Sequence, residues 1–129
     1  NTVNAAIGRI QLEHLDERNG RRQKIAELYK KHLSEDYFLI ENPNGSSVFH
    51  QIIFRHKKRN DIMEHLSKNG IGTTIHYPIP IHKQPLYSYL NLTLSISEEF
   101  SNQVLSLPSY PQLSDDDVKF VCETISQIL

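Results

Sequence analysis

The sequence is poor in the features that mark secreted, membrane-spanning and nucleic-acid-binding proteins. It holds a single cysteine, Cys122, so no disulfide can form within the chain. It has no apolar run near the roughly 18 residues that span a bilayer, and no signal-peptide pattern at its start. Its 14 basic and 15 acidic residues leave a net charge of −1, so no overall field attracts nucleic acid or an anionic membrane. These absences predict a cytoplasmic globular protein of about one domain.

The chain also lacks an initiator methionine. It opens at Asn1 and continues as Thr-Val-Asn-Ala-Ala-Ile-Gly, with no leader sequence. We therefore expect the sequence to be a piece of a longer protein.

Residues 3–33 show helical periodicity. Apolar residues crowd one broad face of the first half and recur at helical spacing in the second half, at Ile25, Leu28, Tyr29 and Leu33. Gly20 weakens the middle of the span, so we expect two helices or one kinked helix. The second half is basic, but acidic residues are interspersed, which favours a solvated, ion-paired face over a nucleic-acid contact.

The remainder alternates between short strands and helices. The expected strands are residues 37–40, 48–54, 73–76 and 104–108, and Asn42–Ser46 has the composition of a turn between the first two. Expected helix starts are a cap at Asn60 and the capping-box spacings Ser95-x-x-Glu98 and Ser114-x-x-Asp117, and Gly70 is the expected end of the first of these helices. The last helix carries an apolar stripe that includes Cys122, so we expect a buried thiol rather than a nucleophile. The pattern predicts an α+β fold, with a sheet of three or four strands packed with helices.

The segment from Gly70 to Pro85 is the richest in chemistry. It places His76, Tyr77, His82 and Lys83 on a stretch stiffened by three prolines, which fix their own φ angles and extend the residues before them. Such a loop can be a rim that donates hydrogen bonds to phosphates or sugar hydroxyls. A structural crossover whose histidines bond local backbone groups is the other reading, and chemistry alone leaves both open.

Other chemistries find little support in the sequence. The histidine pairs 76/82 and 50/56 lack the register of a metal site, and no Gly-x-Ser-x-Gly motif marks a nucleophile. Gly70-x-Gly72 follows an expected helix rather than a strand, which excludes a dinucleotide fingerprint. The aspartates 115–117 are explained by a helix amino terminus.

Four motifs follow one another in order along the chain. They are Ala5-Ala6-Ile7-Gly8-x-x-Gln11-Leu12-x-x-Leu15-Asp16, Arg21-Arg22, Gly70-Ile71-Gly72-Thr73 through His76-Tyr77-Pro78-x-Pro80-x-His82-x-Gln84-Pro85, and Leu105-Ser106-Leu107-Pro108-x-Tyr110-Pro111-x-Leu113-Ser114. Together they resemble the carboxy-terminal part of the DegT/StrS-type aminotransferases, pyridoxal-phosphate enzymes that aminate keto-sugars attached to nucleotides. The resemblance spans essentially all 129 residues.

The resemblance implies part of a fold-type I aminotransferase, normally a homodimer with a large cofactor domain and a small domain. Residues 1–33 would form the interdomain helix region and residues 34–129 the small domain. In the family, the large domain supplies the Schiff-base lysine, the acid that faces the pyridine nitrogen and the phosphate-binding loop. The parent is therefore expected to use pyridoxal 5'-phosphate, whereas this chain alone is expected to bind no cofactor and to be inactive.

The resemblance also implies roles for the proline-stiffened segment. In the family it lies over the mouth of the active site, so His76, Tyr77 and His82 are expected substrate contacts, with Lys83 as a further candidate. The parent would take an amine from an amino-acid donor such as glutamate and pass it to a nucleotide-linked keto-sugar. No catalytic, cofactor-binding or metal-binding residue is expected within this chain.

Two alternatives remain at this point. A related pyridoxal-phosphate sugar dehydratase carries histidine where the aminotransferases carry the Schiff-base lysine, and that position lies outside the chain. A free-standing dimerisation or ligand-binding module without cofactor is the other.

Overall fold

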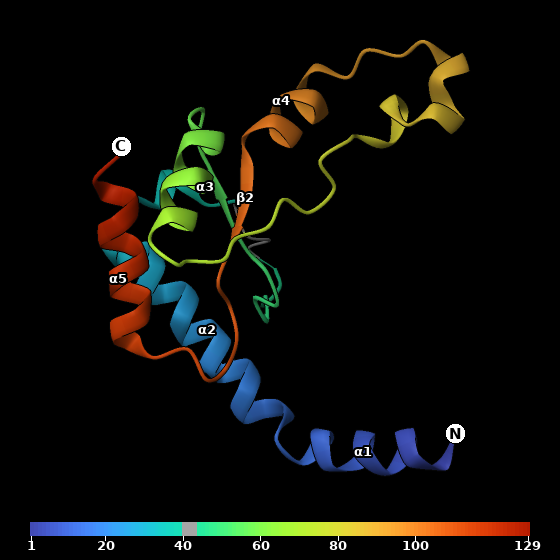
Figure 1. The fold of residues 1–129 in the computed structure, drawn as a ribbon. Helices are drawn as coiled ribbons and strands as arrows, with labels where there is room; N and C mark the ends of the chain where they lie inside the picture. Colours follow the sequence, from blue (N-terminus) through green and yellow to red (C-terminus); the bar gives the residue numbers. More distant parts are fainter. Residues whose placement is uncertain (40–43) are drawn as a thin grey trace.

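Helices and short strands form a small body from which two segments project (Figure 1). The computed structural model describes residues 1–39 and 44–129. The helices are α1 (Thr2–Glu13), α2 (Leu15–His32), α3 (Arg59–Lys68), α4 (Ser95–Gln103) and α5 (Asp115–Ser126), the 3₁₀ helices are η1 (Glu35–Tyr37), η2 (Ile81–Lys83) and η3 (Pro85–Leu90), and the strands are β1 (Ile52–Arg55) and β2 (Val104–Leu107). Helix α1 and the segment between Thr74 and α4 extend away from the body (Figure 1).

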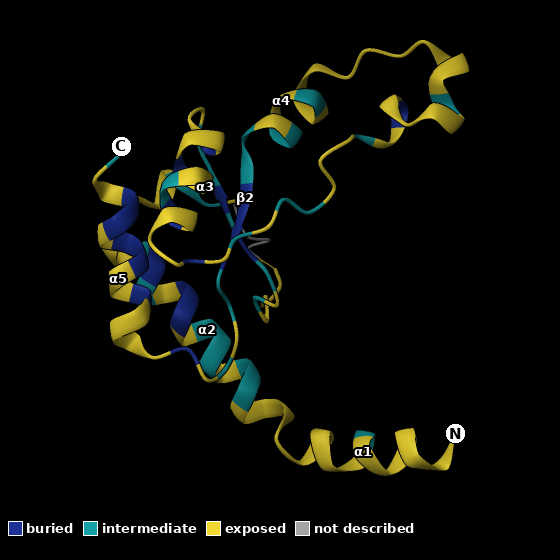
Figure 2. Ribbon diagram, viewed as in Figure 1, coloured by how far each residue is buried: buried dark blue, intermediate teal, exposed yellow. Residues whose placement is uncertain are grey.

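The hydrophobic core lies where α2 and α3 pack against α5 and where α3 covers β2. Burial of apolar side chains drives this packing, and Figure 2 shows the buried residues gathered on these elements. Its largest fully buried side chains include Ile25, Tyr29, Phe54, Ile62, Leu66, Leu105, Val118 and Ile125. The expected stripe on the last helix is confirmed, and burial raises the pKa of the Cys122 thiol to about 12. The thiol is therefore protonated at neutral pH and is not an activated nucleophile.

The sheet has two strands among the described residues, rather than the three or four expected. β1 and β2 pair antiparallel, with Ile52 opposite Leu107 and Arg55 opposite Val104. Two further segments join through single bridges, Phe38 to Phe54 on one side and Thr74 to Ser106 on the other. The four expected segments therefore lie side by side, but the outer two pair over one residue each.

Strand β1 begins at Ile52 rather than at Val48 as expected. Phe49 has a positive φ of 48°, which is incompatible with an extended strand. Its N–H donates to Ser47 Oγ at 3.1 Å and its carbonyl accepts from Ser109 Oγ at 2.8 Å, so the turn is held on both sides. The expected strand at 37–40 is likewise replaced by η1 and the bridge at Phe38. Ile40 and the first part of the expected turn at 42–46 lie outside the described residues.

The helical span from Thr2 to His32 forms two helices, one of the two expected forms, but they separate at His14 and not at Gly20 as expected. His14 has φ −109° and ψ 9°, and its N–H bonds back to the Gln11 carbonyl at 3.3 Å. Asp16 and Glu17 then occupy the first turn of α2, where the helix dipole favours acidic groups. These local signals decide the break, and Gly20 continues within α2.

The ends of α3 show one wrong and one confirmed prediction. The helix begins at Arg59 after Lys58, so Asn60 lies inside it, where its Oδ1 accepts from Arg59 Nε at 2.7 Å instead of capping. Gly70 ends the helix as expected, with φ 74°. Its N–H reaches the Ser67 carbonyl at 3.0 Å and the next N–H reaches Leu66 at 2.9 Å, which together form a Schellman motif.

The caps of α4 and α5 also differ from each other. At α5 the capping box between Ser114 and Asp117 is confirmed. At α4 the cap residue is Leu94, not Ser95, and Glu98 Oε1 accepts the Leu94 N–H at 3.0 Å. The acidic half of the expected box is therefore present, one residue out of register.

No helix among residues 1–39 and 44–129 is both long and apolar enough to cross a membrane.

Candidate functional site

The expected site residues lie on the longer of the two projections, residues 76–94, which we call the arm. The arm leaves the body next to Thr74, passes through η2 and η3, and returns at α4 (Figure 1). Pro78, Pro80 and Pro85 restrict its backbone, as expected from the sequence. The arm holds its shape through these prolines and a few polar contacts rather than through a core of its own.

His76 stands at the base of the arm and is fixed to the sheet. Its Nδ1 lies 2.7 Å from the Oγ of Ser106, a buried residue of β2. The imidazole is half-buried, so the rest of the ring borders open space. The neighbouring bridge between Thr74 and Ser106 holds the backbone at the same point.

Tyr77 follows in a conformation that side chains rarely adopt. Its φ is 59°, in the left-handed region, and it directly precedes Pro78. Its side chain is 84% exposed. Strained backbone of this kind is retained where a particular side-chain direction is needed. The strain turns the phenol outward beside a histidine that is held in place.

His82 and Lys83 converge on Glu98. His82 is only 8% exposed, and its Nε2 lies 3.0 Å from Glu98 Oε1. Lys83 Nζ lies 3.3 Å from the same oxygen. The His82 hydrogen bond, followed by the Leu94 N–H, lowers the pKa of Glu98 from 4.5 to about 2. Glu98 is therefore ionised, and both basic side chains already face an anion.

Glu98 is the residue of this site that the sequence reasoning missed. The sequence assigned it only to a helix cap, because its spacing to Ser95 matches a capping box. Its partners on η2 lie 15 and 16 positions away in sequence, and no periodic pattern links them. Only the path of the arm brings them together.

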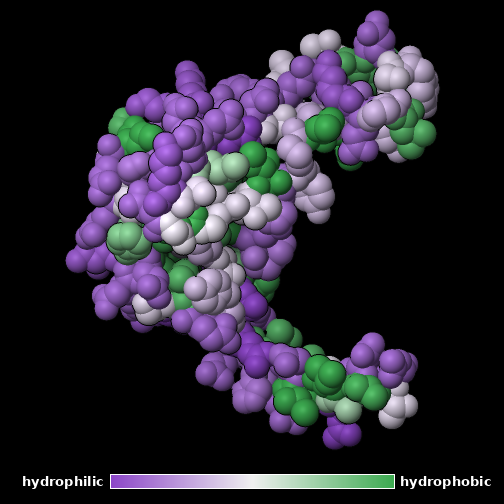
Figure 3. Space-filling model, viewed as in Figure 1, coloured by the Kyte–Doolittle hydropathy of each residue, from purple (hydrophilic) through white to green (hydrophobic). Residues whose placement is uncertain are grey.

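A groove of about 960 Å³ runs between the arm and the body. His76, Tyr77 and His82 line it, whereas Lys83 does not. Most of the other lining is apolar and includes Ile53 of β1, Phe100 of α4, and Ile79, Ile81, Leu90 and Leu92 of the arm. Figure 3 shows the arm standing away from the body with apolar side chains on its surface. The groove thus combines a few polar groups with a wide apolar wall.

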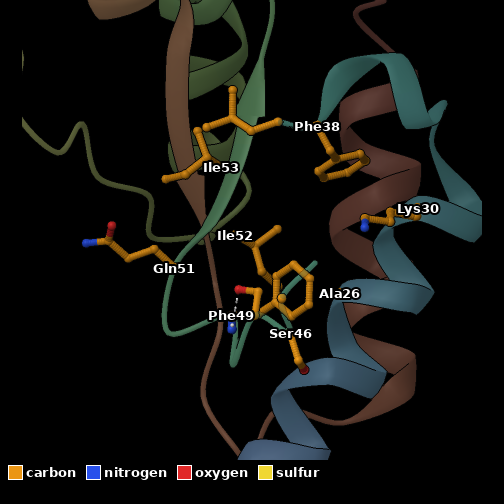
Figure 4. A pocket seen from close by; sticks show the side chains of 11 residues that line it. Ala26, Lys30, Phe38, Ser46, Phe49, Gln51, Ile52 and Ile53 are labelled. Atoms are coloured by element: carbon orange, nitrogen blue, oxygen red, sulfur yellow. Dashed lines mark hydrogen bonds between the residues drawn. The ribbon is translucent and has the colours of Figure 1, made fainter. Parts of the chain in front are cut away.

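A second cleft of about 430 Å³ lies between α2 and the segment that leads into β1. Figure 4 shows Phe49 packed between Ser46 and Ala26, with Lys30 and Phe38 farther along the cleft. The Lys30 ammonium lies 5.2 Å from the centre of the Phe49 ring, a cation–π distance. No residue expected to bind substrate lines this cleft.

The described residues do not fit a pyridoxal-phosphate or metal site. All the lysines of the chain lie among them, and none is buried. No carboxylate of residues 1–39 and 44–129 is buried where it could face a pyridine nitrogen. The same residues contain no cluster of three or more histidine, cysteine or acidic groups that could hold a metal ion.

Residues 1–126 match the DegT/DnrJ/EryC1/StrS aminotransferase family. The chain belongs to this family. The match covers nearly the whole sequence and agrees with the order of the four motifs. The family resemblance and the mixed helix-and-strand fold expected from the sequence are both confirmed.

Individual relatives of this family member are nucleotide-sugar aminotransferases by name. The chain is 35% identical over 128 residues to dTDP-3-amino-3,6-dideoxy-alpha-D-galactopyranose transaminase of Aneurinibacillus thermoaerophilus. The match includes 97% of this chain and 35% of that protein. It is 33% identical over 129 residues to UDP-2-acetamido-2-deoxy-3-oxo-D-glucuronate aminotransferase of Pseudomonas aeruginosa, with the same two coverages. The chain therefore spans about a third of the length of the relatives that it matches.

Solved structures of larger proteins share the fold. S. venezuelae DesV in complex with a ketimine intermediate matches 95% of the chain with a TM-score of 0.88 at 33% identity, and the match covers 35% of DesV. The ntda protein of Bacillus subtilis with bound cofactor PMP matches with a TM-score of 0.83 at 30% identity, again over 95% of the chain and 31% of that protein. The body, with its two projections, is thus an architecture found within these larger enzymes.

Proposed function

We propose that this chain is the carboxy-terminal part of an aminotransferase that transfers an amino group from an amino acid to a nucleotide-linked keto-sugar. The family match and the names of the relatives support the reaction class. In this proposal residues 1–33 are the interdomain helix region and residues 34–129 the small domain. The amino acid leaves as a 2-oxo acid, and the ketone carbon of the sugar receives the amine.

The arm supplies substrate contacts. The observation that carries this proposal is the pairing of a fixed imidazole with an outward phenol, namely His76 bonded to Ser106 and Tyr77 held at φ 59°. Both line the groove. An imidazole N–H and a phenol O–H can donate to phosphate or sugar oxygens. The apolar wall can pack against the nucleobase or against carbon-bound faces of the sugar.

His82 and Lys83 belong to the same rim but make a different contribution. Their nitrogens already lie within 3.3 Å of Glu98. Lys83 has further N–H donors and His82 has a second ring nitrogen, but the carboxylate already sets where both side chains lie. We therefore assign direct contact first to His76 and Tyr77.

The cofactor belongs to the two thirds of the parent that this chain does not cover. Pyridoxal phosphate supplies the electron sink that amine transfer requires. Since the described residues do not fit a site for it, this chain's part in the reaction is to hold and orient substrate and to cover the groove. The homodimer and the cytoplasmic location implied by the resemblance and the composition belong to the same proposal.

The reaction is tested on the full-length protein that contains this chain. The protein is incubated with pyridoxal phosphate, glutamate and a UDP- or dTDP-linked 3-keto-sugar, and the products are identified by mass spectrometry. An amino-sugar nucleotide together with 2-oxoglutarate supports the aminotransferase. A deoxygenated sugar nucleotide without consumption of glutamate identifies the related dehydratase instead.

The role of the arm is tested by Tyr77→Ala in the same protein. Loss of one buried hydrogen bond and of ring contact should weaken binding of UDP or dTDP by about tenfold. Isothermal titration calorimetry measures the dissociation constants. Tyr89→Ala is the matched control, because Tyr89 is 77% exposed on η3 but does not line the groove. Equal affinities for the two variants would remove Tyr77 from the site.

A further inference from the structure

We propose that Glu98 is the positioning residue of the arm. It ties η2 to the first turn of α4 and so keeps the arm in a fixed position beside the groove. The tether itself follows from the geometry below. Its importance for substrate binding rests on the proposed function.

Three donors from the arm meet at one oxygen of Glu98. The Leu94 N–H and the His82 Nε2 each lie 3.0 Å from Oε1, and Lys83 Nζ lies 3.3 Å from it. Since Glu98 is ionised and can only accept, the His82 ring carries its proton on Nε2. Hydrogen bonds to a charged acceptor are stronger than those between neutral groups. One carboxylate therefore joins the middle of the arm to its end.

Helix α4 provides a fixed support for this carboxylate. Arg55 of β1 donates from Nη2 to Glu99 Oε1 at 2.8 Å and from Nε to Gln103 Oε1 at 2.7 Å. The buried Arg59 of α3 donates from Nη1 to the carbonyls of Val104 at 3.0 Å and Ser101 at 3.4 Å. The face of α4 that carries Glu99 is thus bonded to the sheet and to α3, while Glu98 is bonded to the arm.

The arm has little else to hold its middle in place. Its apolar side chains Ile81, Leu86 and Tyr89 are more than two-thirds exposed, and Ile79 is half-exposed. At its base the arm is bonded to the body through His76 and Ser106. His82 lies in η2, after Pro78 and Pro80, and is buried against Glu98. Removing the carboxylate would therefore free η2 while leaving the base attached.

This arrangement gives His82 and Lys83 a positioning role. One nitrogen of each lies within 3.3 Å of Glu98, so of the four expected site residues His76 and Tyr77 are the two that line the groove without a bond to this carboxylate. A freed η2 would displace the part of the groove wall that carries Ile79, Ile81 and His82, while His76 keeps its bond to Ser106.

Hydrogen–deuterium exchange of the full-length protein tests the tether. Glu98→Ala should raise the exchange rate of the Leu94 amide, and of the Lys83 and Gln84 amides of η2, by at least about tenfold. Glu123→Ala is the matched control, because it removes an exposed carboxylate of α5 that pairs with Lys119 rather than with the arm or with Arg55. Unchanged exchange in the arm of Glu98→Ala, or an equal rise in both variants, would overturn the inference.

Nucleotide affinity distinguishes a positioning role of Glu98 from an effect of Glu98 on the overall stability of the protein. UDP and dTDP should bind about fivefold to tenfold more weakly to Glu98→Ala than to Glu123→Ala, at equal melting temperatures. Glu98→Gln, which keeps an acceptor oxygen at the same reach, should restore part of both the protection and the affinity. Tighter binding in Glu98→Ala would overturn the inference, since Glu98 would then be competing with the ligand for His82 and Lys83. A freed arm with unchanged nucleotide affinity would support the tether and contradict the proposed function of the rim.

Discussion

Glu98 illustrates how a carboxylate acquires a strongly lowered pKa chiefly from hydrogen bonds, with the charge of Lys83 adding to them. The His82 N–H, the Leu94 N–H and the Lys83 ammonium all favour its ionised form, so its pKa falls from 4.5 to about 2. A carboxyl whose pKa is lower in the folded state stabilises that state fully above the unfolded pKa. The contribution is lost as the pH falls from about 4.5 through about 2.

The titration of the Glu98 carboxyl group is directly measurable. A carbon-detected NMR titration of the Glu98 side chain should show a midpoint near pH 2. Since the His82 hydrogen bond is the largest cause, the midpoint in His82→Ala should move up towards 4.5. A midpoint near 4.5 in the unsubstituted protein would mean that the three donors do not meet at this carboxylate in solution.

At the scale of single residues, the sequence predicted which side chains matter better than what they contact. It placed His76 and His82 on one rim as equal members. The structure bonds the first to Ser106 and buries the second against Glu98. These partners lie 30 and 16 positions away, and only the pairing of β2 and the return of the arm bring them close. A single sequence without a contact map cannot provide that information.

Two glycines of the helices should respond in opposite directions to the same substitution. Gly70 has φ 74° at the end of α3, so Gly70→Ala forces a side chain into the left-handed region and should lower the free energy of unfolding by about 1 kcal/mol. Gly20 lies inside α2 with open space around its Cβ position. Gly20→Ala should therefore raise the free energy of unfolding by about 0.5–1 kcal/mol.

Urea denaturation of both variants checks this pair. No atom lies within 4 Å of a Cβ added at either position, so packing does not distinguish the two sites and backbone conformation alone does. If Gly70→Ala were to raise the unfolding midpoint, the assignment of Gly70 to a Schellman motif would be wrong, and if Gly20→Ala were to lower it, the helical setting of Gly20 would be wrong.

At the scale of elements, local signals succeeded where they act within one turn. The Ser114–Asp117 capping box and the Gly70 helix end are confirmed. The sequence failed where two signals competed. Asn60 has the chemistry of a cap, but the helix starts one residue earlier. The apolar run from Val48 reads as a strand, yet the contacts of Phe49 with Ser47 and Ser109 turn its first half away from the sheet.

At the scale of the whole molecule, helix α1 carries apolar side chains that no other described element buries. No residue of α1 is buried, and Ile7 and Ile10 are 53% and 57% exposed. Figure 3 shows apolar side chains gathered on this helix. Exposed apolar faces of this kind promote association. We therefore expect the 129-residue chain to self-associate at high concentration.

Ile7→Lys should reduce this association by about tenfold, because burial of an isoleucine contributes about 1.5–3 kcal/mol. Light scattering at increasing protein concentration measures the apparent mass. Asn4→Lys adds the same charge to the same helix without removing an apolar side chain, and should leave the association unchanged. Monomeric scattering of the unsubstituted chain at high concentration would contradict the expectation.

At this largest scale the sequence predicted the family and the α+β architecture from motifs spread over the entire chain, and both are confirmed. The number of strands was overestimated, because the segments at Phe38 and Thr74 meet the sheet through single bridges. Edge pairing depends on how far each segment runs alongside its neighbour, and neither composition nor periodicity records that distance.

The two attachment points of the arm have a mechanical consequence. Ser106 and Glu98 lie on β2 and α4, which follow each other without a connecting residue between Gln103 and Val104. The base and the middle of the arm are therefore bonded to one continuous stretch of chain. A shift of β2 along β1 would displace both attachment points together. The arm would then move over the groove as one unit instead of bending.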